Sequence, residues 1–236
     1  MKKIGSVFNR ELYSFFASPI AYVVLTIYLV LTGYFFCLLL FYSESDNVMT
    51  YLFGNMMLIF MLICPLLTMR VFSEEVALGT FELIITSPIR LTDWIIGKFF
   101  AVLFLYSMML ALTFPYVVIL KWIGNPALRP IFSGYLGVFL AGAAFIAVGV
   151  FASSLSRSQM IAAFVGFGFT LLLWIIGWSA TLASGAFFNF IQLLSFLDHF
   201  HNFEKGLISS ADIIYYLSFI VLFLFLTHQR FQLRRQ

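Results

Sequence analysis

The sequence is short of charge: only 10% of its 236 residues are Asp, Glu, Lys or Arg, against about 25% in an ordinary soluble domain. Hydrophobic residues make up 63% of the chain, and the mean hydropathy is +1.05. This composition excludes a soluble globular domain. Apolar runs of about 20 residues, each long enough to cross about 30 Å of hydrocarbon, recur along the chain. We therefore predict an all-α, multi-pass membrane protein.

Cysteine is also scarce, and sequence signals for chemistry are missing. The two cysteines, Cys37 and Cys64, both lie in apolar runs, so we expect small buried hydrophobic residues and not a disulfide or a metal site. The chain has no G-x-x-x-x-G-K-[ST] loop to hold a nucleotide. It places no charged residue near the middle of an apolar run, where proton relays and ion-coupled carriers usually keep one. The energy for any work is therefore expected from another protein.

Six membrane spans can be drawn, all within a single domain, 1–236. The predicted spans are 20–41, 51–69, 97–120, 134–155, 160–183 and 213–227. Residues 184–211 are apolar but broken by charges, and we expect a re-entrant or interfacial hairpin there. The spans 134–155 and 160–183 are rich in Gly and Ala, which allow close packing of helices in lipid.

The cations are distributed unevenly between the two sides of the predicted bundle. With the N-terminus inside, one side carries ten Lys and Arg residues and the other only three, namely Lys121, Arg129 and Lys205. The positive-inside rule then puts both termini in the cytoplasm. The net charge of +3 does not predict nucleic-acid binding, because its distribution across the membrane already explains it.

Residues 4–18 differ from the spans. Apolar side chains alternate there with Asn9, Arg10 and Glu11, and Ser18-Pro19 ends the segment. This pattern is typical of an amphipathic helix lying in the inner membrane interface. A plain cytoplasmic extension of the first span is the alternative.

One polar cluster between the fifth and sixth spans invites a metal-site interpretation. It contains Asp198, His199, His201 and Glu204. Two histidines separated by one residue would point to different sides of a helix, and the spacing matches no common metal site. We favour a structural role on the outer face over a metal or catalytic one.

The densest charges lie in the loop 70–97, on the predicted cytoplasmic side. Ser73 could cap a helix over 74–86 whose first turn holds Glu74 and Glu75. Ser87 and Pro88 would end it. Gly79 and Thr80 would form a small notch, where a glycine costs about 1 kcal/mol in a helix unless another surface must approach. A docking element and an amphipathic connector on the inner leaflet both fit.

This loop resembles the signature loop of type-2 ATP-binding-cassette (ABC) permeases. The matching residues are Met69-Arg70, Glu74-Glu75, Gly79-Thr80-Phe81-Glu82-Leu83, Thr86-Ser87-Pro88, Trp94 and Gly97-Lys98. Two further stretches are similar to the gliding-motility-associated subgroup: Arg10-Glu11-Leu12 through Ser18-Pro19-Ile20-Ala21-Tyr22, and His199-Phe200 through Tyr215-Tyr216. Val76 departs from the family, which often has Arg or Lys there.

The resemblance implies a permease subunit of the bacterial inner membrane. Residues 4–18 would be its elbow helix, and the helix over 74–86 would be the coupling helix that docks on a separate cytoplasmic ATPase. Arg157 would make a smaller second contact. ATP and Mg would bind the ATPase, so this chain would hold no cofactor and would not itself be an enzyme. A second permease subunit, identical or different, and an extracytoplasmic accessory protein are further implied partners. The alternative is a scaffold subunit that transmits motion to an extracytoplasmic partner and moves no substrate.

Overall fold

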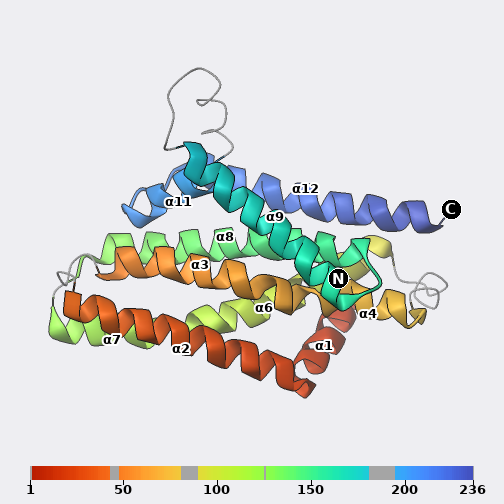
Figure 1. Cartoon of the computed structure of the whole chain (residues 1–236), viewed down its shortest axis with the longest axis horizontal. Coiled ribbons are helices and arrows are strands. Elements are labelled where there is room, and N and C mark those ends of the chain that lie inside the picture. Colours follow the sequence, from red (N-terminus) through yellow and green to blue (C-terminus); the bar gives the residue numbers. More distant parts are fainter. Residues whose placement is uncertain (1, 43–47, 81–89, 125, 181–194, 236) are drawn as a thin grey trace.

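The computed structural model describes residues 2–42, 48–80, 90–124, 126–180 and 195–235, and its regular structure there is helical throughout (Figure 1). Six stretches in this part of the chain are long and apolar enough to cross a membrane, as predicted. They comprise α2 (Pro19–Tyr42), α3 (Val48–Thr68) with α4 (Arg70–Ala77), α6 (Leu91–Ala111) with α7 (Phe114–Ile123), α8 (Leu128–Leu155), α9 (Gln159–Ala180) and α12 (Ser210–Arg235). The shorter α1 (Lys2–Ala17) and α11 (Phe196–Glu204) complete the set.

The central helix of the bundle is α8, which is the most buried of the six spans. Small residues let its neighbours approach closely, because a Cβ at Gly134, Gly142 or Gly149 would overlap Phe53, Tyr106 or Thr68 respectively. These contacts reach α3 on one side and α6 on the other. Close packing of this kind stabilises helices in lipid, where the hydrophobic effect between helices is absent. The predicted packing role of the glycines in the fourth span is confirmed.

Three spans lie at the edge of the bundle with most of their surface uncovered. These are α2, α9 and α12, and their exposed side chains are large and apolar, as at Tyr34, Phe164 and Val221. A surface of this composition suits lipid or another membrane helix. Cys64 is buried, as predicted, whereas Cys37 on α2 is exposed, so the prediction of burial was wrong for Cys37.

The predicted third span, 97–120, was drawn as one helix, but the structure divides it. α6 ends at Ala111, and α7 begins at Phe114 with Pro115 in its first turn. Proline lacks an N–H and is favoured at such a start. Thr113 lies at the break, where its hydroxyl donates to the carbonyl of Leu110 at 2.7 Å. The divided helix still has the length of a span, so the number of spans is unchanged.

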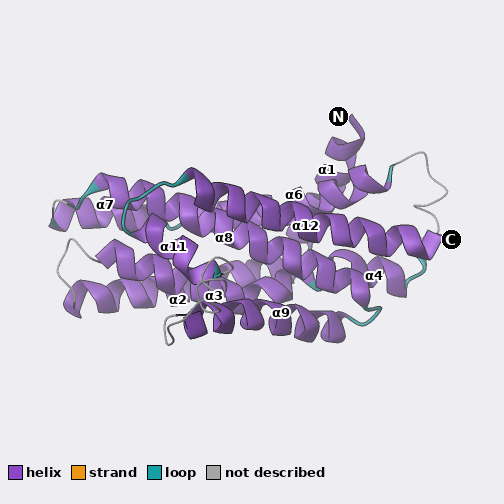
Figure 2. Ribbon diagram, turned by 90° about the horizontal axis from the view of Figure 1, so that it is seen from above, coloured by secondary structure: helices purple, strands orange, loops and turns teal. Residues whose placement is uncertain are grey.

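The two ends of the bundle are formed by different helices. α4 and the C-terminus lie at one end, near α1, while α7 lies at the opposite end in both views (Figures 1 and 2). We call these the α4 end and the α7 end.

Candidate functional site

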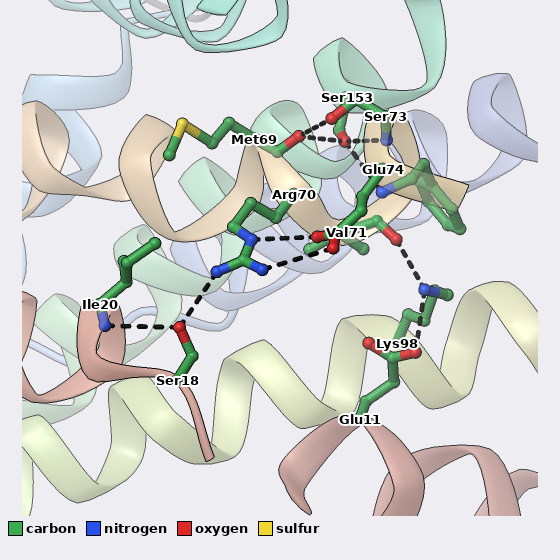
Figure 3. Close-up of polar contacts among 11 residues, drawn as sticks. Glu11, Ser18, Ile20, Met69, Arg70, Val71, Ser73, Glu74, Lys98 and Ser153 are labelled. Carbon is green, nitrogen blue, oxygen red and sulfur yellow. Dashed lines mark hydrogen bonds and ion pairs between the residues drawn. The ribbon is translucent and has the colours of Figure 1, made fainter. Parts of the chain in front are cut away.

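The most concentrated polar structure in the described residues is built around Lys98 at the α4 end. Lys98 belongs to the second turn of α6, and only 2% of its side chain is exposed. Its ammonium group lies 2.6 Å from the carbonyl oxygen of Val71 and 2.9 Å from Oε1 of Glu11 (Figure 3). It also lies 3.1 Å from Oε2 of Glu75. A lysine has three N–H donors, and these three oxygens surround it. The charge is therefore compensated although it is removed from water.

Glu75 connects this lysine to the first helix. Its Oε1 lies 3.5 Å from an amino nitrogen of Arg10, and its side chain is only 12% exposed. Its Oε2 forms an ion pair with Lys98 by distance, without the orientation of a hydrogen bond. Since Glu11 and Arg10 both belong to α1, the network of Arg10, Glu11, Glu75 and Lys98 joins α1, α4 and α6. We call these four residues the charge network.

Aromatic rings close the other side of Lys98. The ammonium lies 5.4 Å from the ring centroid of Phe72 and 5.5 Å from that of Trp94, within the range of a cation–π attraction. Phe231 of α12 packs against both rings, at centroid distances of 4.9 Å and 5.1 Å. The rings exclude water from the lysine, which strengthens its interactions with the surrounding oxygens.

The junction between α3 and α4 is held by a serine from the central helix. The hydroxyl of Ser153 accepts hydrogen bonds from the backbone N–H groups of Phe72 and Ser73, at 3.0 Å and 3.2 Å, and donates to the carbonyl of Met69 at 3.0 Å (Figure 3). The hydroxyl of Ser73 donates to the same carbonyl. Side chains inserted into the backbone ladder in this way bend helices. α4 thus follows α3 directly along the chain and is fixed to α8 by Ser153.

The predicted N-cap at Ser73 is therefore wrong. The helix begins at Arg70, not at Glu74, because the backbone N–H groups of Phe72 and Ser73 are already satisfied by Ser153. Glu74 and Glu75 lie in its second half and not in its first turn. Instead of facing a helix N-terminus, the Glu74 carboxylate accepts from Arg70, whose Nε lies 3.0 Å from Oε2 of Glu74. Arg70 also donates to the hydroxyl of Ser18 at 3.0 Å.

The interpretation of Gly79 as a notch in the middle of a helix also needs correction. α4 ends at Ala77, and Gly79 follows with a φ of +72°. No atom lies within 4 Å of a Cβ built at that position, so space is not what requires glycine there. Glycine is required there by the left-handed backbone conformation, because residues other than glycine rarely adopt it. Thr80 then donates from its hydroxyl to the carbonyl of Glu75 at 3.2 Å.

Of the remaining residues in the predicted docking set, only some belong to the part of the chain that the structure describes. Phe81, Glu82, Leu83, Ser87 and Pro88 lie outside the described residues. Arg157 is exposed in the connection between α8 and α9, only a few residues beyond Ser153. The described part of the loop exposes Ala77, Leu78 and Gly79. The largest of these side chains, Leu78, is 71% exposed, and Glu74 beside them is 39% exposed.

The cluster at 198–204 is divided between two separate pairs. Ser195 is the N-cap of α11, and its hydroxyl accepts from the backbone N–H of Asp198 at 3.2 Å. His199 Nδ1 lies 2.5 Å from Oδ1 of the buried Asp212, while His201 Nδ1 lies 2.6 Å from Oε2 of Glu204. The two histidines do point to different sides, as predicted. No group of three potential metal ligands occurs among the described residues.

Hydrogen bonds explain how this short helix is fixed to the bundle. Asn202 donates to Oδ2 of Asp212 at 3.1 Å, and the hydroxyl of Tyr216 donates to the carbonyl of Phe196 at 2.9 Å. Ser133 of α8 donates to the carbonyl of Phe203. The described part of the predicted 184–211 hairpin is thus one docked helix, and residues 184–194 lie outside the described residues.

Sequence reasoning missed Lys98 as a buried residue and Ser153 as a helix junction. Lys98 was assigned to the inner cations and to the start of a span, and the signal that it could be buried was its position after Trp94, Ile95 and Ile96. No local pattern distinguishes Ser153 from the other small residues of its helix.

The chain was also compared with known proteins. No protein-family model matches it, and no curated protein matches it at a significant level.

Proposed function

We propose that this chain is the permease subunit of an ABC exporter, coupling ATP hydrolysis by a separate subunit to movement of a substrate across the bacterial inner membrane. The proposal rests on the signature-like loop and on one structural observation, which is the way α4 is connected to the bundle. The described residues tie this short charged helix to α1 and α6 through Lys98 and to α8 through Ser153. In this proposal both termini and α4 face the cytoplasm.

The contacts of α4 with its neighbours would allow a displacement of α4 to be transmitted to the membrane spans. A force on α4 reaches α3 through the chain, α8 through the three hydrogen bonds of Ser153, and α1 and α6 through the charge network. A link made of buried charges and backbone hydrogen bonds resists deformation more than one made of exposed side chains. The same geometry leaves Leu78 exposed at the tip, available to a partner that supplies the force.

The experiment is co-expression of the chain with a candidate cytoplasmic ABC ATPase subunit from the same genome. We expect a complex whose ATPase activity depends on the permease and on Leu78. Leu78→Arg is the test variant and Leu233→Arg is its matched control, because the two leucines are 71% and 67% exposed on helices that end near each other at the α4 end. Loss of the complex in Leu78→Arg alone supports the proposal. If Leu78→Arg and Glu82→Arg both leave the complex and its ATPase activity intact, α4 is not the docking element.

Transport is distinguished from mechanical transmission by reconstitution. The purified complex in liposomes should move a candidate lipid-like or peptide substrate only when ATP is present, and a variant of the ATPase that cannot hydrolyse ATP should abolish the movement. ATP hydrolysis that drives a conformational change in the spans, without movement of any substrate in a panel, would instead favour the scaffold function.

A further inference from the structure

The break between α6 and α7 creates an apolar groove on the surface of the bundle. Its volume is about 520 Å³, and it is bordered by the end of α6, the start of α7 and the first three turns of α8. Among the residues that line it, Phe114, Leu128 and Phe132 are each more than half exposed. The groove is at the α7 end, opposite the charge network (Figures 1 and 2).

The few polar groups in the wall of the groove are already satisfied. The hydroxyl of Tyr135 lies 3.1 Å from Oγ1 of Thr113 and 3.2 Å from its carbonyl oxygen. Ser107 donates to the carbonyl of Leu103 at 2.7 Å. The two polar side chains in the wall, Ser107 and Tyr135, are thus already hydrogen-bonded, and the rest of the lining side chains are apolar, which suits a hydrocarbon occupant.

The length of the groove matches one leaflet. It follows α8 from Leu128 to Phe139, and at 1.5 Å per residue this stretch covers about 16 Å. The hydrocarbon core of a bilayer is about 30 Å thick, so the groove is about half as long as the core is thick. Trp122, which is 88% exposed on α7, is the kind of residue that sits at headgroup level.

Two cations lie at the shallow end of the groove. Lys121 follows the groove residue Val117 by four positions in α7, and Arg129 precedes the groove residue Phe132 by three in α8. Residues with these spacings share a helix face. Both cations are exposed, and neither pairs with an acidic side chain in the part of the chain that the structure describes.

From the apolar wall, its length and the two exposed cations on the faces that line it, we infer that the groove binds one acyl chain of an anionic phospholipid, whose phosphate lies between Lys121 and Arg129. The acyl chain occupies the space next to the α6–α7 break, where a packed bundle would otherwise leave a void. The headgroup selects anionic over zwitterionic lipids, because only an anionic lipid retains a net charge to attract both cations. This site does not depend on the proposed ATPase partner.

The test uses the purified full-length chain in vesicles that contain a trace of photoactivatable lipid. The probe is phosphatidylglycerol with a diazirine near the end of one acyl chain, and the same label on phosphatidylcholine is the comparison. After illumination, mass spectrometry locates the adducts. We expect phosphatidylglycerol adducts to concentrate in 107–117 and 128–139, at several times the yield obtained with phosphatidylcholine.

Two variants separate the acyl chain from the headgroup. Lys121→Gln with Arg129→Gln should lower the phosphatidylglycerol adducts in the groove about thirtyfold, as expected for two interfacial cations, and should leave those of phosphatidylcholine unchanged. Ala111→Trp, which fills the groove, should remove the adducts of both lipids. The matched controls are Arg157→Gln, an exposed cation at the other end, and Gly168→Trp on α9, where no atom lies within 4 Å of a Cβ.

Each contrary result overturns a stated part of the inference. Equal yields for the two lipids in the unaltered protein, or an unchanged yield after both cations are neutralised, would exclude the anionic headgroup. Adducts that persist in Ala111→Trp, or that spread evenly over α2, α9 and α12, would exclude the groove. The doubly neutralised variant changes only exposed side chains, so it keeps the test informative even if Ala111→Trp fails to fold.

Discussion

The ammonium of Lys98 lies 2.9 Å from the carboxylate of Glu11, and this contact joins the third span to the first helix of the chain. The lysine is 2% exposed and the glutamate 14%. Breaking such a pair by removing one partner leaves an uncompensated charge in a dry site, and this typically costs about 3–5 kcal/mol. The contact therefore matters to the fold whether or not an ATPase binds nearby.

Replacing Lys98 with methionine should lower the free energy of unfolding by about 3–5 kcal/mol, because Glu11 would lose its ion pair with Lys98 and Glu75 would keep only the exposed Arg10. The measurement is reversible unfolding in SDS, with Lys121→Met as the exposed control. Adding Glu11→Gln and Glu75→Gln to Lys98→Met should recover most of the loss, since replacing a whole buried ion cluster by neutral groups is often harmless. A single variant as stable as the unaltered protein would contradict the buried network.

Gly142→Ala should destabilise the bundle by about 1–3 kcal/mol, because overpacking forces neighbours out of position. The added methyl group would overlap the ring of Tyr106, which is fully buried and donates to the carbonyl of Val138 at 2.7 Å. Gly168→Ala is the control: it meets open space and should stabilise its helix by up to about 1 kcal/mol. Thermal unfolding midpoints in one detergent compare the two, and equal midpoints would show that α8 does not pack as described.

The features that depend on neighbouring residues in the sequence could be predicted, whereas those that depend on contacts between distant segments could not. The six spans follow from local composition, and the opposite directions of His199 and His201 follow from helix geometry, so both predictions are confirmed. The break at Thr113 had a local signal in Pro115, which the apolar run concealed.

The charge network had no such signal. Glu11, Glu75 and Lys98 come from three distant segments, and their sequence neighbourhoods favour the membrane interface for each of them. Ser73 failed as a predicted cap for the same reason. The local capping rule predicts that Ser73 accepts from the free N–H groups at the start of a helix. In the structure, the N–H groups of Phe72 and Ser73 donate to the hydroxyl of Ser153 from α8.

Gly79→Ala should loosen the end of α4 more than Gly79→Asn. The left-handed conformation at a φ of +72° costs an alanine about 1–2 kcal/mol, while asparagine tolerates it better. Hydrogen exchange of the backbone amides of Leu78 and Thr80 is the measurement, because the Leu78 amide donates to the carbonyl of Glu74 at 3.0 Å. We expect exchange to be fastest with alanine at position 79, slower with asparagine and slowest with glycine. Identical exchange in all three would mean that Gly79 does not hold this conformation.

The pair of His201 and Glu204 should make stability depend on pH. The hydrogen bond that the protonated His201 ring donates to the Glu204 carboxylate raises the pKa of His201 above 6.5, although partial burial opposes the shift. The folded protein therefore binds this proton more tightly than the unfolded chain does. The stabilisation is complete below pH 6.5 and is lost as the pH rises through the raised pKa.

The temperature at the midpoint of thermal unfolding should accordingly decrease as the pH is raised from 6.5 to above the raised pKa of His201. His201→Gln should remove this part of the decrease. Glu204→Gln should do the same, because it keeps the size of the partner and removes the charge that holds the proton. Thermal unfolding at matched ionic strength gives the difference between each variant and the unaltered protein at every pH. A difference that stays constant with pH would show that His201 and Glu204 do not form this pair, and the contacts of α11 with Asp212, Tyr216 and Ser133 would remain.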